Sequence, residues 1–314
     1  MSNYVEPRLR RDFGGIITAF FNFLKANIKG IINVFIGYNG MFFILFLISV
    51  YFLITGFVEF LILQNSVVYG GNVSTDSAAI TMAIATIFLF LIIFIATIFN
   101  FSLCSNYLSI YEKGKKNNIP KREVWIKTKQ NILGVILFSL LAVGIYVIYG
   151  IGYFILNLIL VYIPLLPFII SIVLGGALNS WIGMALMSYI HNESKNILEA
   201  FGESWQLLFS GFWKAVGVNV VLGTLIQICI FSLQIVPGII FGVIAFHAIE
   251  DSGSFTDSTI SHILVIVFLT LFCIMFMFIQ LLSQIINAFL YFNLHEFKNN
   301  EYLRSRITQI GSIE

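Results

Sequence analysis

The sequence contains a stretch of 60 residues, 131–190, without a single charged side chain. As one helix this stretch would be roughly 90 Å long, about three times the thickness of the hydrocarbon core of a membrane. We therefore interpret it as a hairpin of two membrane-spanning helices. The first is predicted over about 131–156 and the second over about 158–190. Asn157 and the region 162–167 mark the turn and the bent start of the second helix.

The composition agrees with a membrane protein. Hydrophobic residues make up 59% of the chain, charged residues 10%, and the mean hydropathy is +0.96. An ordinary soluble domain is about 45–50% apolar and about 25% charged. These values exclude a soluble globular enzyme, a disordered protein and a nucleic-acid-binding protein. The apolar runs are continuous rather than alternating, which favours helices over a β-barrel.

Four further apolar runs are long enough to cross a membrane, and with the hairpin they give six spans. They cover residues 41–63, 78–103, 212–249 and 263–294. The predicted fold class is therefore all-α, a polytopic membrane bundle of six transmembrane helices with amphipathic helices on the inner leaflet. The predicted organisation is a cytoplasmic N-terminus with an interfacial helix (1–40), a six-span membrane domain (41–294) and a cytoplasmic tail (295–314).

The basic residues predict the orientation of these spans. All 17 lysines and arginines fall in the N-terminal segment, the loops after the second and fourth spans, and the tail. A six-span topology places these four segments on one side. The other side holds Asp76, Glu250, Asp251 and Asp257. Since basic residues mark the cytoplasmic side, both termini are predicted to be cytoplasmic.

Three segments that precede spans have an amphipathic pattern. They are residues 12–35, 123–129 and 199–214, and each combines lysine with apolar residues at helical spacing. Tryptophan beside lysine is typical of a membrane–water boundary. Such segments either anchor the chain on the inner leaflet or dock a partner or sense lipid. The candidate docking residues are Trp125, Trp205, Phe212 and Trp213.

The layout of a basic amphipathic stretch followed by two spans occurs three times. The second span of each pair ends in a similar sequence: Ser109-Ile-Tyr-Glu-Lys, Tyr189-Ile-His-Asn-Glu-Ser-Lys and Asn293-Leu-His-Glu-Phe-Lys. Aligning Tyr111, His191 and His295 is consistent with a parallel tandem repeat. The alternative is that the three endings share only the amino-acid composition typical of a membrane boundary, without a repeat.

Polar residues within the spans are candidates for function because burying them is costly. Glu59 near the outer end of the first span either reaches the interface or binds a proton or cation. Gln280, Gln284 and Asn287 share one helix face, and they either hydrogen-bond to other helices or line a solute path. Pro237 and Gly238 predict a kink or an outer extension in the fifth span.

No sequence motif for catalysis, nucleotide binding or metal binding is present. The three cysteines, Cys104, Cys229 and Cys273, lie far apart in apolar segments of the sequence, and we interpret them as small apolar side chains packed between helices. The sequence therefore predicts no catalytic residue, no cofactor, no metal and no nucleic-acid partner.

Four short sequences in the second half resemble a known family. They are Ala200-Phe-Gly-Glu-Ser-Trp, Gly211-Phe-Trp-Lys, Ile235-Val-Pro-Gly-Ile-Ile and Ala288-Phe-Leu-Tyr-Phe-Asn-Leu. They look like a bacterial six-span membrane family that includes the membrane domain of some glycerophosphodiester phosphodiesterases and stand-alone relatives of no known activity. The resemblance covers roughly residues 122–301.

The chain also departs from that family. Related proteins often close with a Tyr-x-Asp-x-Arg pattern, where this chain has Tyr291-Phe-Asn-Leu-His. A soluble phosphodiesterase part has no counterpart here, so the resemblance implies no glycerophosphodiesterase activity. It implies an all-helical, multi-span inner-membrane protein that serves as a scaffold or accessory subunit.

The sequence thus predicts a protein that is not an enzyme and contacts the lipid bilayer and other membrane proteins or a second copy of itself. The alternative is a transporter or channel for a lipid or small solute. A lipid-directed activity without a recognisable motif is a third hypothesis, supported only by the resemblance.

Overall fold

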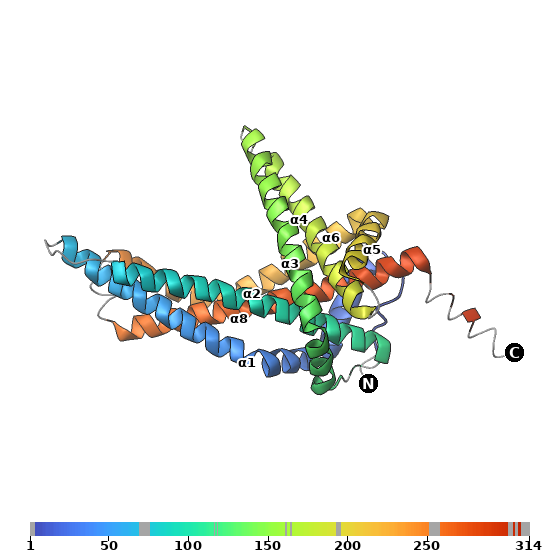
Figure 1. The fold of residues 1–314 in the computed structure, drawn as a ribbon, viewed down its shortest axis with the longest axis horizontal. Coiled ribbons are helices and arrows are strands. Elements are labelled where there is room, and N and C mark those ends of the chain that lie inside the picture. The colour runs from blue at the N-terminus through green and yellow to red at the C-terminus, as the bar shows by residue number, and fades with distance from the viewer. Residues whose placement is uncertain are drawn as a thin grey trace. The chain divides into compact units, whose positions relative to one another are not determined.

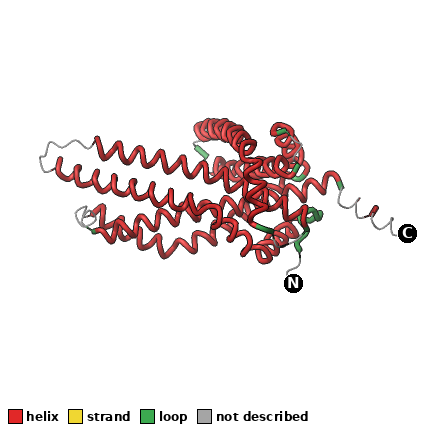
Figure 2. Tube along the Cα trace, turned by 60° about the horizontal axis from the view of Figure 1, so that its bottom comes forward, coloured by secondary structure: helices red, strands yellow, loops and turns green. Residues whose placement is uncertain are grey.

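The computed structural model describes residues 4–68, 76–115, 117, 119–160, 162–163, 165–192, 196–250, 258–300, 304 and 307–308. This described part of the chain forms seven helices and no strand (Figures 1 and 2). They are α1 (Phe13–Val68), α2 (Asp76–Gly114), α3 (Lys121–Ile159), α4 (Leu165–His191), α5 (Ile197–Ser210), α6 (Phe212–Glu250) and α8 (Thr259–Asn299). The predicted all-α fold is confirmed.

Six of the helices in the described chain are long and apolar enough to cross a membrane, and α5 is the exception. They match the six predicted spans in number and in order along the sequence. The chain is therefore a multi-pass integral membrane protein, and the predicted six-helix architecture is confirmed.

The uncharged stretch 131–190 forms the predicted hairpin of α3 and α4, which pack along each other (Figure 1). The first helix is longer than predicted and runs on to Ile159. Asn157 does not end it, because its Nδ2 donates a 2.8 Å hydrogen bond to the carbonyl oxygen of Tyr153 within the same helix. Pro167 is tolerated in the first turn of α4, where backbone N–H groups have no partner inside the helix.

The N-terminal amphipathic segment and the first span form one continuous helix, α1. A boundary was expected at residue 40, but α1 continues through it, and no proline lies between residues 13 and 68 to end the helix. The basic segment 123–129 is likewise the first part of α3. By contrast, α5 is a separate helix that ends at Ser210, before Gly211 and the start of α6.

The chain divides into two compact units. Unit 1 comprises residues 1–34, 98–226 and 280–314, and unit 2 comprises residues 35–97 and 227–279. Helices α1, α2, α6 and α8 each contribute one part to unit 1 and another part to unit 2. Helices α3, α4 and α5 belong to unit 1 alone.

Aromatic stacking fixes α5 in unit 1. The centre of the Phe201 ring lies 4.7 Å from the ring centre of Phe138 on α3 and 5.5 Å from the ring centre of Trp181 on α4. Trp181 Nε1 also donates a 3.0 Å hydrogen bond to the carbonyl oxygen of Phe201. Phe201 belongs to a buried cluster with Val135, Ala142, Ala185, Leu186 and Ile190. The buried face of this amphipathic helix is therefore held by both helices of the hairpin.

Unit 2 has a smaller apolar core. Val50 and Ile54 of α1 and Val265 of α8 are buried together, with Leu89 of α2 and Phe241 of α6 packed against them. Most other large apolar side chains of this unit are exposed. Such a surface is expected where lipid tails surround the helices.

Candidate functional site

The ends of α2, α4 and α8 in unit 1 are buried on all sides. Nearly every side chain over 102–112, 183–191 and 281–294 is shielded from solvent. Many of these side chains are polar, which is costly unless they are hydrogen-bonded. These are the three span endings that the sequence analysis aligned, and the structure brings them together. Together with Arg8 from the N-terminal segment and Glu203 from α5, their polar groups form what we call the helix-end cluster: Arg8, Ser109, Glu112, Ser188, His191, Asn192, Glu203, Tyr291 and His295.

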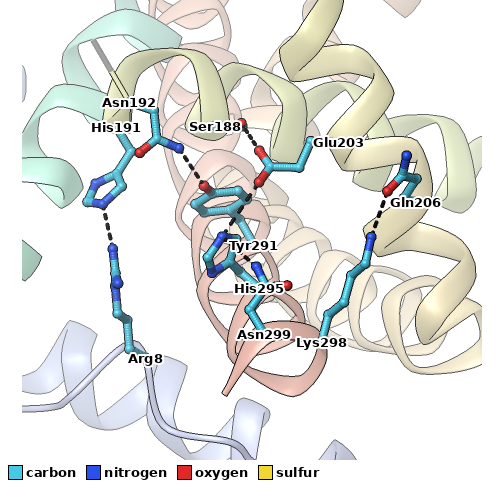
Figure 3. A network of polar contacts seen from close by, with 10 residues as sticks. All are labelled: Arg8, Ser188, His191, Asn192, Glu203, Gln206, Tyr291, His295, Lys298 and Asn299. Carbon is cyan, nitrogen blue, oxygen red and sulfur yellow. Dashed lines mark hydrogen bonds and ion pairs between the residues drawn. The ribbon is translucent and has the colours of Figure 1, made fainter. Parts of the chain in front are cut away.

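Arg8 is central to one half of the cluster. Its Nε lies 2.8 Å from Glu112 Oε1. Its Nη2 lies 2.8 Å from His191 Nε2 (Figure 3). Ser109 Oγ lies 3.3 Å from the other ring nitrogen, Nδ1. Glu112 and His191 are only 8% and 5% exposed. A buried carboxylate is thus paired with a charged donor from the N-terminal segment.

The contact with Arg8 determines the tautomer of His191. A guanidinium only donates hydrogen bonds, so Nε2 must be the acceptor and the ring proton lies on Nδ1. His191 is therefore neutral, and its 3.6 Å approach to Glu112 Oε2 is not an ion pair. Nδ1–H donates to Ser109, so His191 cannot take a proton from that hydroxyl. The Ser–His–Glu arrangement consequently lacks the activated nucleophile of a hydrolase.

The other half of the cluster joins α4, α5 and α8. Asn192 Nδ2 donates a 3.2 Å hydrogen bond to the hydroxyl of Tyr291, and the hydroxyl of Ser188 donates to Glu203 Oε2. His295 Nε2 lies 3.5 Å from Glu203 Oε1 (Figure 3). Each of these contacts joins two segments of the chain, with Asn192 lying just after the end of α4. The cluster therefore holds the ends of the three helices together.

Residues 4–11 form a non-helical strap over the cluster. The backbone N–H of Val5 donates to the hydroxyl of Tyr111 (2.9 Å), and this hydroxyl donates back to the carbonyl of Val5 (3.1 Å). Asn293 Nδ2 donates a 2.9 Å hydrogen bond to the carbonyl of Leu9. With Arg8 on Glu112 and His191, the strap contacts all three helix ends.

Arg11 stabilises the bend of the strap. Its guanidinium donates to the carbonyl oxygens of Glu6 (2.7 Å) and Leu9 (3.3 Å). Burial lowers the pKa of this guanidinium, and the nearby carboxylate of Glu6 acts in the opposite direction. An arginine pKa starts so high that the group stays protonated at neutral pH.

A second polar network lies deeper in unit 1. Asn219 Nδ2 donates to Ser180 Oγ (2.6 Å) and to Asn287 Oδ1 (2.9 Å), and Asn179 Nδ2 donates to Asn219 Oδ1 (2.9 Å). These bonds join α4, α6 and α8. Gln284 Nε2 of α8 donates to Ser105 Oγ of α2 (2.8 Å) and to the carbonyl of Gly183 of α4 (3.1 Å).

Two members of the predicted polar stripe are therefore helix-joining residues. Gln284 and Asn287 are almost fully buried, and both hydrogen-bond to neighbouring helices. Gln280 is half-buried. Gly183 permits the close approach, because a Cβ atom there would overlap the Asn287 amide.

The other predicted site residues lie outside the helix-end cluster. Glu59 is exposed on the part of α1 that belongs to unit 2. Pro237 and Gly238 lie inside α6, which continues through them to Glu250.

The predicted docking aromatics lie in unit 1. Trp125 is half-buried beside Phe99, with Lys129 Nζ 5.8 Å from the centre of its ring. Trp205 and Trp213 are exposed, and Phe212 is half-buried between Phe209 and Trp213. The choice between a lipid anchor and a docking surface stays open.

Sequence reasoning missed the residues that complete both networks. Arg8 and Asn219 have no local motif, and their partners lie far away in the sequence. Glu203 lies in the sequence Ala200-Phe-Gly-Glu-Ser-Trp, which gave no sign of its contacts with Ser188 and His295. The one sequence feature that pointed to the helix-end cluster was the similarity of the three span endings, which contain Glu112, His191 and His295. Within the described residues no group of three His, Cys, Asp or Glu side chains is placed to hold a metal ion.

Comparison with protein families, curated proteins and solved structures finds no match for this chain. The resemblance to the phosphodiesterase-associated membrane family therefore stays a prediction.

Proposed function

We propose that this multi-pass membrane protein is a scaffold or accessory subunit that binds other membrane helices through its α3–α4 hairpin. The observation that carries this proposal is the exposure of the distal hairpin. Among the described residues of 143–176, Pro167 alone is buried. We call residues 143–176 the hairpin arm.

The arm offers a partner a long apolar surface without charges. Its exposed side chains are mostly isoleucine, leucine, phenylalanine and tyrosine, and its glycines at 144, 150 and 152 have open space around their Cα atoms. Inside a membrane, helices associate through close packing rather than through the hydrophobic effect, and small residues favour such packing. A partner helix can therefore approach α3 closely.

The interior of unit 1 supports the same function. Its buried polar side chains bond to one another across helices, so they stabilise the bundle. His191 is held in a tautomer that cannot activate Ser109. These features fit a rigid base from which the hairpin arm projects.

The test is photo-crosslinking in living cells. A crosslinking amino acid is placed at Ile148 or Phe154 in the arm, and at Ile87 or Phe90 of α2 as matched controls, since all four are large, apolar and strongly exposed. We expect both arm positions to crosslink the same membrane protein, or a second copy of the chain, in high yield. The α2 positions should give no such product.

Two results would contradict the proposal. One is an arm that crosslinks no protein while the chain is correctly inserted. The other is equal yields at the arm and at α2, which indicates random collisions in the membrane. A crosslinked partner should also co-purify with the wild-type chain in mild detergent at a fixed ratio.

A further inference from the structure

Two cations from different segments of unit 1 approach the same aromatic ring. The guanidinium carbon of Arg10 lies 4.3 Å from the centre of the Phe297 ring, and the ammonium nitrogen of Lys214 lies 5.0 Å from it. The strap, the start of α6 and the end of α8 thus bring two like charges together. We call Arg10, Lys214 and Phe297 the cation patch.

The patch keeps unused hydrogen-bond donors. Lys214 Nζ donates one 3.1 Å bond to the carbonyl oxygen of Arg11, and an ammonium has three donors. Arg10 is exposed, and its guanidinium makes no hydrogen bond to another described residue. The carboxylate of Asp12 lies near enough to Lys214 to act against the lowering of its pKa by burial and by Arg10, and its Oδ1 accepts a 2.8 Å bond from the backbone N–H of Gly15 at the start of α1. An anion at the patch would therefore find several free N–H groups.

Apolar side chains beside the patch are exposed. Leu9, Phe13 and Trp213 all present large apolar surfaces, and Trp213 is 73% exposed. Lys214 is also the last charged residue before a stretch, 215–249, that has no lysine, arginine, aspartate or glutamate. Basic residues and tryptophan at the start of such a stretch are typical of the membrane–water boundary. This pattern favours a position of the patch at the depth of the lipid headgroups.

We propose that the cation patch binds the phosphate headgroup of an anionic phospholipid. Arginine and lysine are the side chains that bind phosphate best, and an anion between them also removes their mutual repulsion. The neighbouring exposed Leu9, Phe13 and Trp213 favour a lipid over a soluble phosphate, because they offer contact to acyl chains. The site is independent of the hairpin arm and of the function proposed for it.

The test measures lipid binding to the purified full chain by native mass spectrometry in detergent. Phosphatidylglycerol and phosphatidylcholine with identical acyl chains are titrated separately, and inorganic phosphate is added as a competitor. We expect phosphatidylglycerol to bind more tightly. The variant Arg10→Gln/Lys214→Gln should lose about thirtyfold in affinity for it, the loss expected for two basic residues at an anionic surface.

The matched control is Arg122→Gln/Lys25→Gln, which removes the same two residue types from exposed positions on other helices. It should change the affinity less than twofold. The proposal is overturned by equal binding of the two lipids, by equal losses in the two variants, or by full competition from inorganic phosphate. If the patch variant does not fold, the affinity of Arg10→Gln for phosphatidylglycerol is measured instead. This variant is expected to fold, because the Arg10 side chain is exposed and hydrogen-bonds to no described residue. An unchanged affinity in that variant overturns the proposal.

Discussion

At the residue scale, the helix-end cluster depends on one ion pair between distant parts of the sequence. Arg8 Nε contacts Glu112 Oε1 at 2.8 Å, and the carboxylate is nearly buried. A buried charge that loses its partner is costly, whereas removing both charges is often close to neutral. Arg8 is therefore expected to stabilise the protein mainly by neutralising the buried carboxylate of Glu112.

This asymmetry predicts the outcome of a pair of substitutions. Arg8→Met should lower the free energy of unfolding by about 3 kcal/mol, because it leaves the Glu112 carboxylate without its partner. Arg8→Met/Glu112→Gln should recover more than half of that loss. Thermal unfolding in detergent, followed by tryptophan fluorescence, measures both, with Arg122→Met as the exposed control. A double variant less stable than Arg8→Met would show that the pair itself supplies the stability.

The close approach of α4 and α8 gives a second prediction at this scale. Gly183→Ala should destabilise the protein by about 1–3 kcal/mol, since the new methyl group meets the Asn287 amide in a packed interior. Gly202→Ala in α5 is the control, because nothing lies within 4 Å of the added Cβ. That change should stabilise the helix by up to about 1 kcal/mol. Equal effects of the two changes would contradict this packing.

At the element scale, α5 is the one described helix too short to span a membrane, and it is attached to the hairpin through Phe201. This ring stacks on Phe138 and makes an edge-to-face contact with Trp181, while Trp205 and Phe209 on the same helix are exposed. The amphipathic pattern of residues 199–214 predicted a helix with one apolar face. It could not show that part of this face packs on protein.

Truncating the two kinds of aromatic residue on α5 should separate these roles. Phe201→Ala should cost about 3–5 kcal/mol, as for other large buried side chains, and increase hydrogen exchange across α5. Phe209→Ala should leave the exchange of α5 nearly unchanged in detergent. Hydrogen exchange with mass spectrometry measures both variants. Rapid exchange of α5 in the wild-type protein would contradict the proposed attachment.

At the scale of the whole molecule, the sequence predicted the spans and missed the contacts between them. Six apolar runs specify six helices because the membrane requires about 20 apolar residues per crossing. The similar endings around Tyr111, His191 and His295 are consistent with a repeat, but only the folded chain shows that the three helix ends meet, through contacts such as Ser109 with His191 and His191 with Phe292. Arg8 and Asn219 gave no signal, since partners such as His191 and Asn287 lie more than a helix away in sequence. Local periodicity carries no information about such pairs.

The orientation of the molecule is the remaining prediction at this scale. All 17 basic residues fall on one side of six spans, so this side should face the cytoplasm. In a chain whose native cysteines are replaced by serine, Asp76→Cys should react with a membrane-impermeant maleimide in intact cells. Arg122→Cys should react only after the cells are permeabilised, because α2 separates the two exposed positions by one membrane crossing. The reverse labelling pattern would show that the acidic loops, rather than the basic ones, are cytoplasmic.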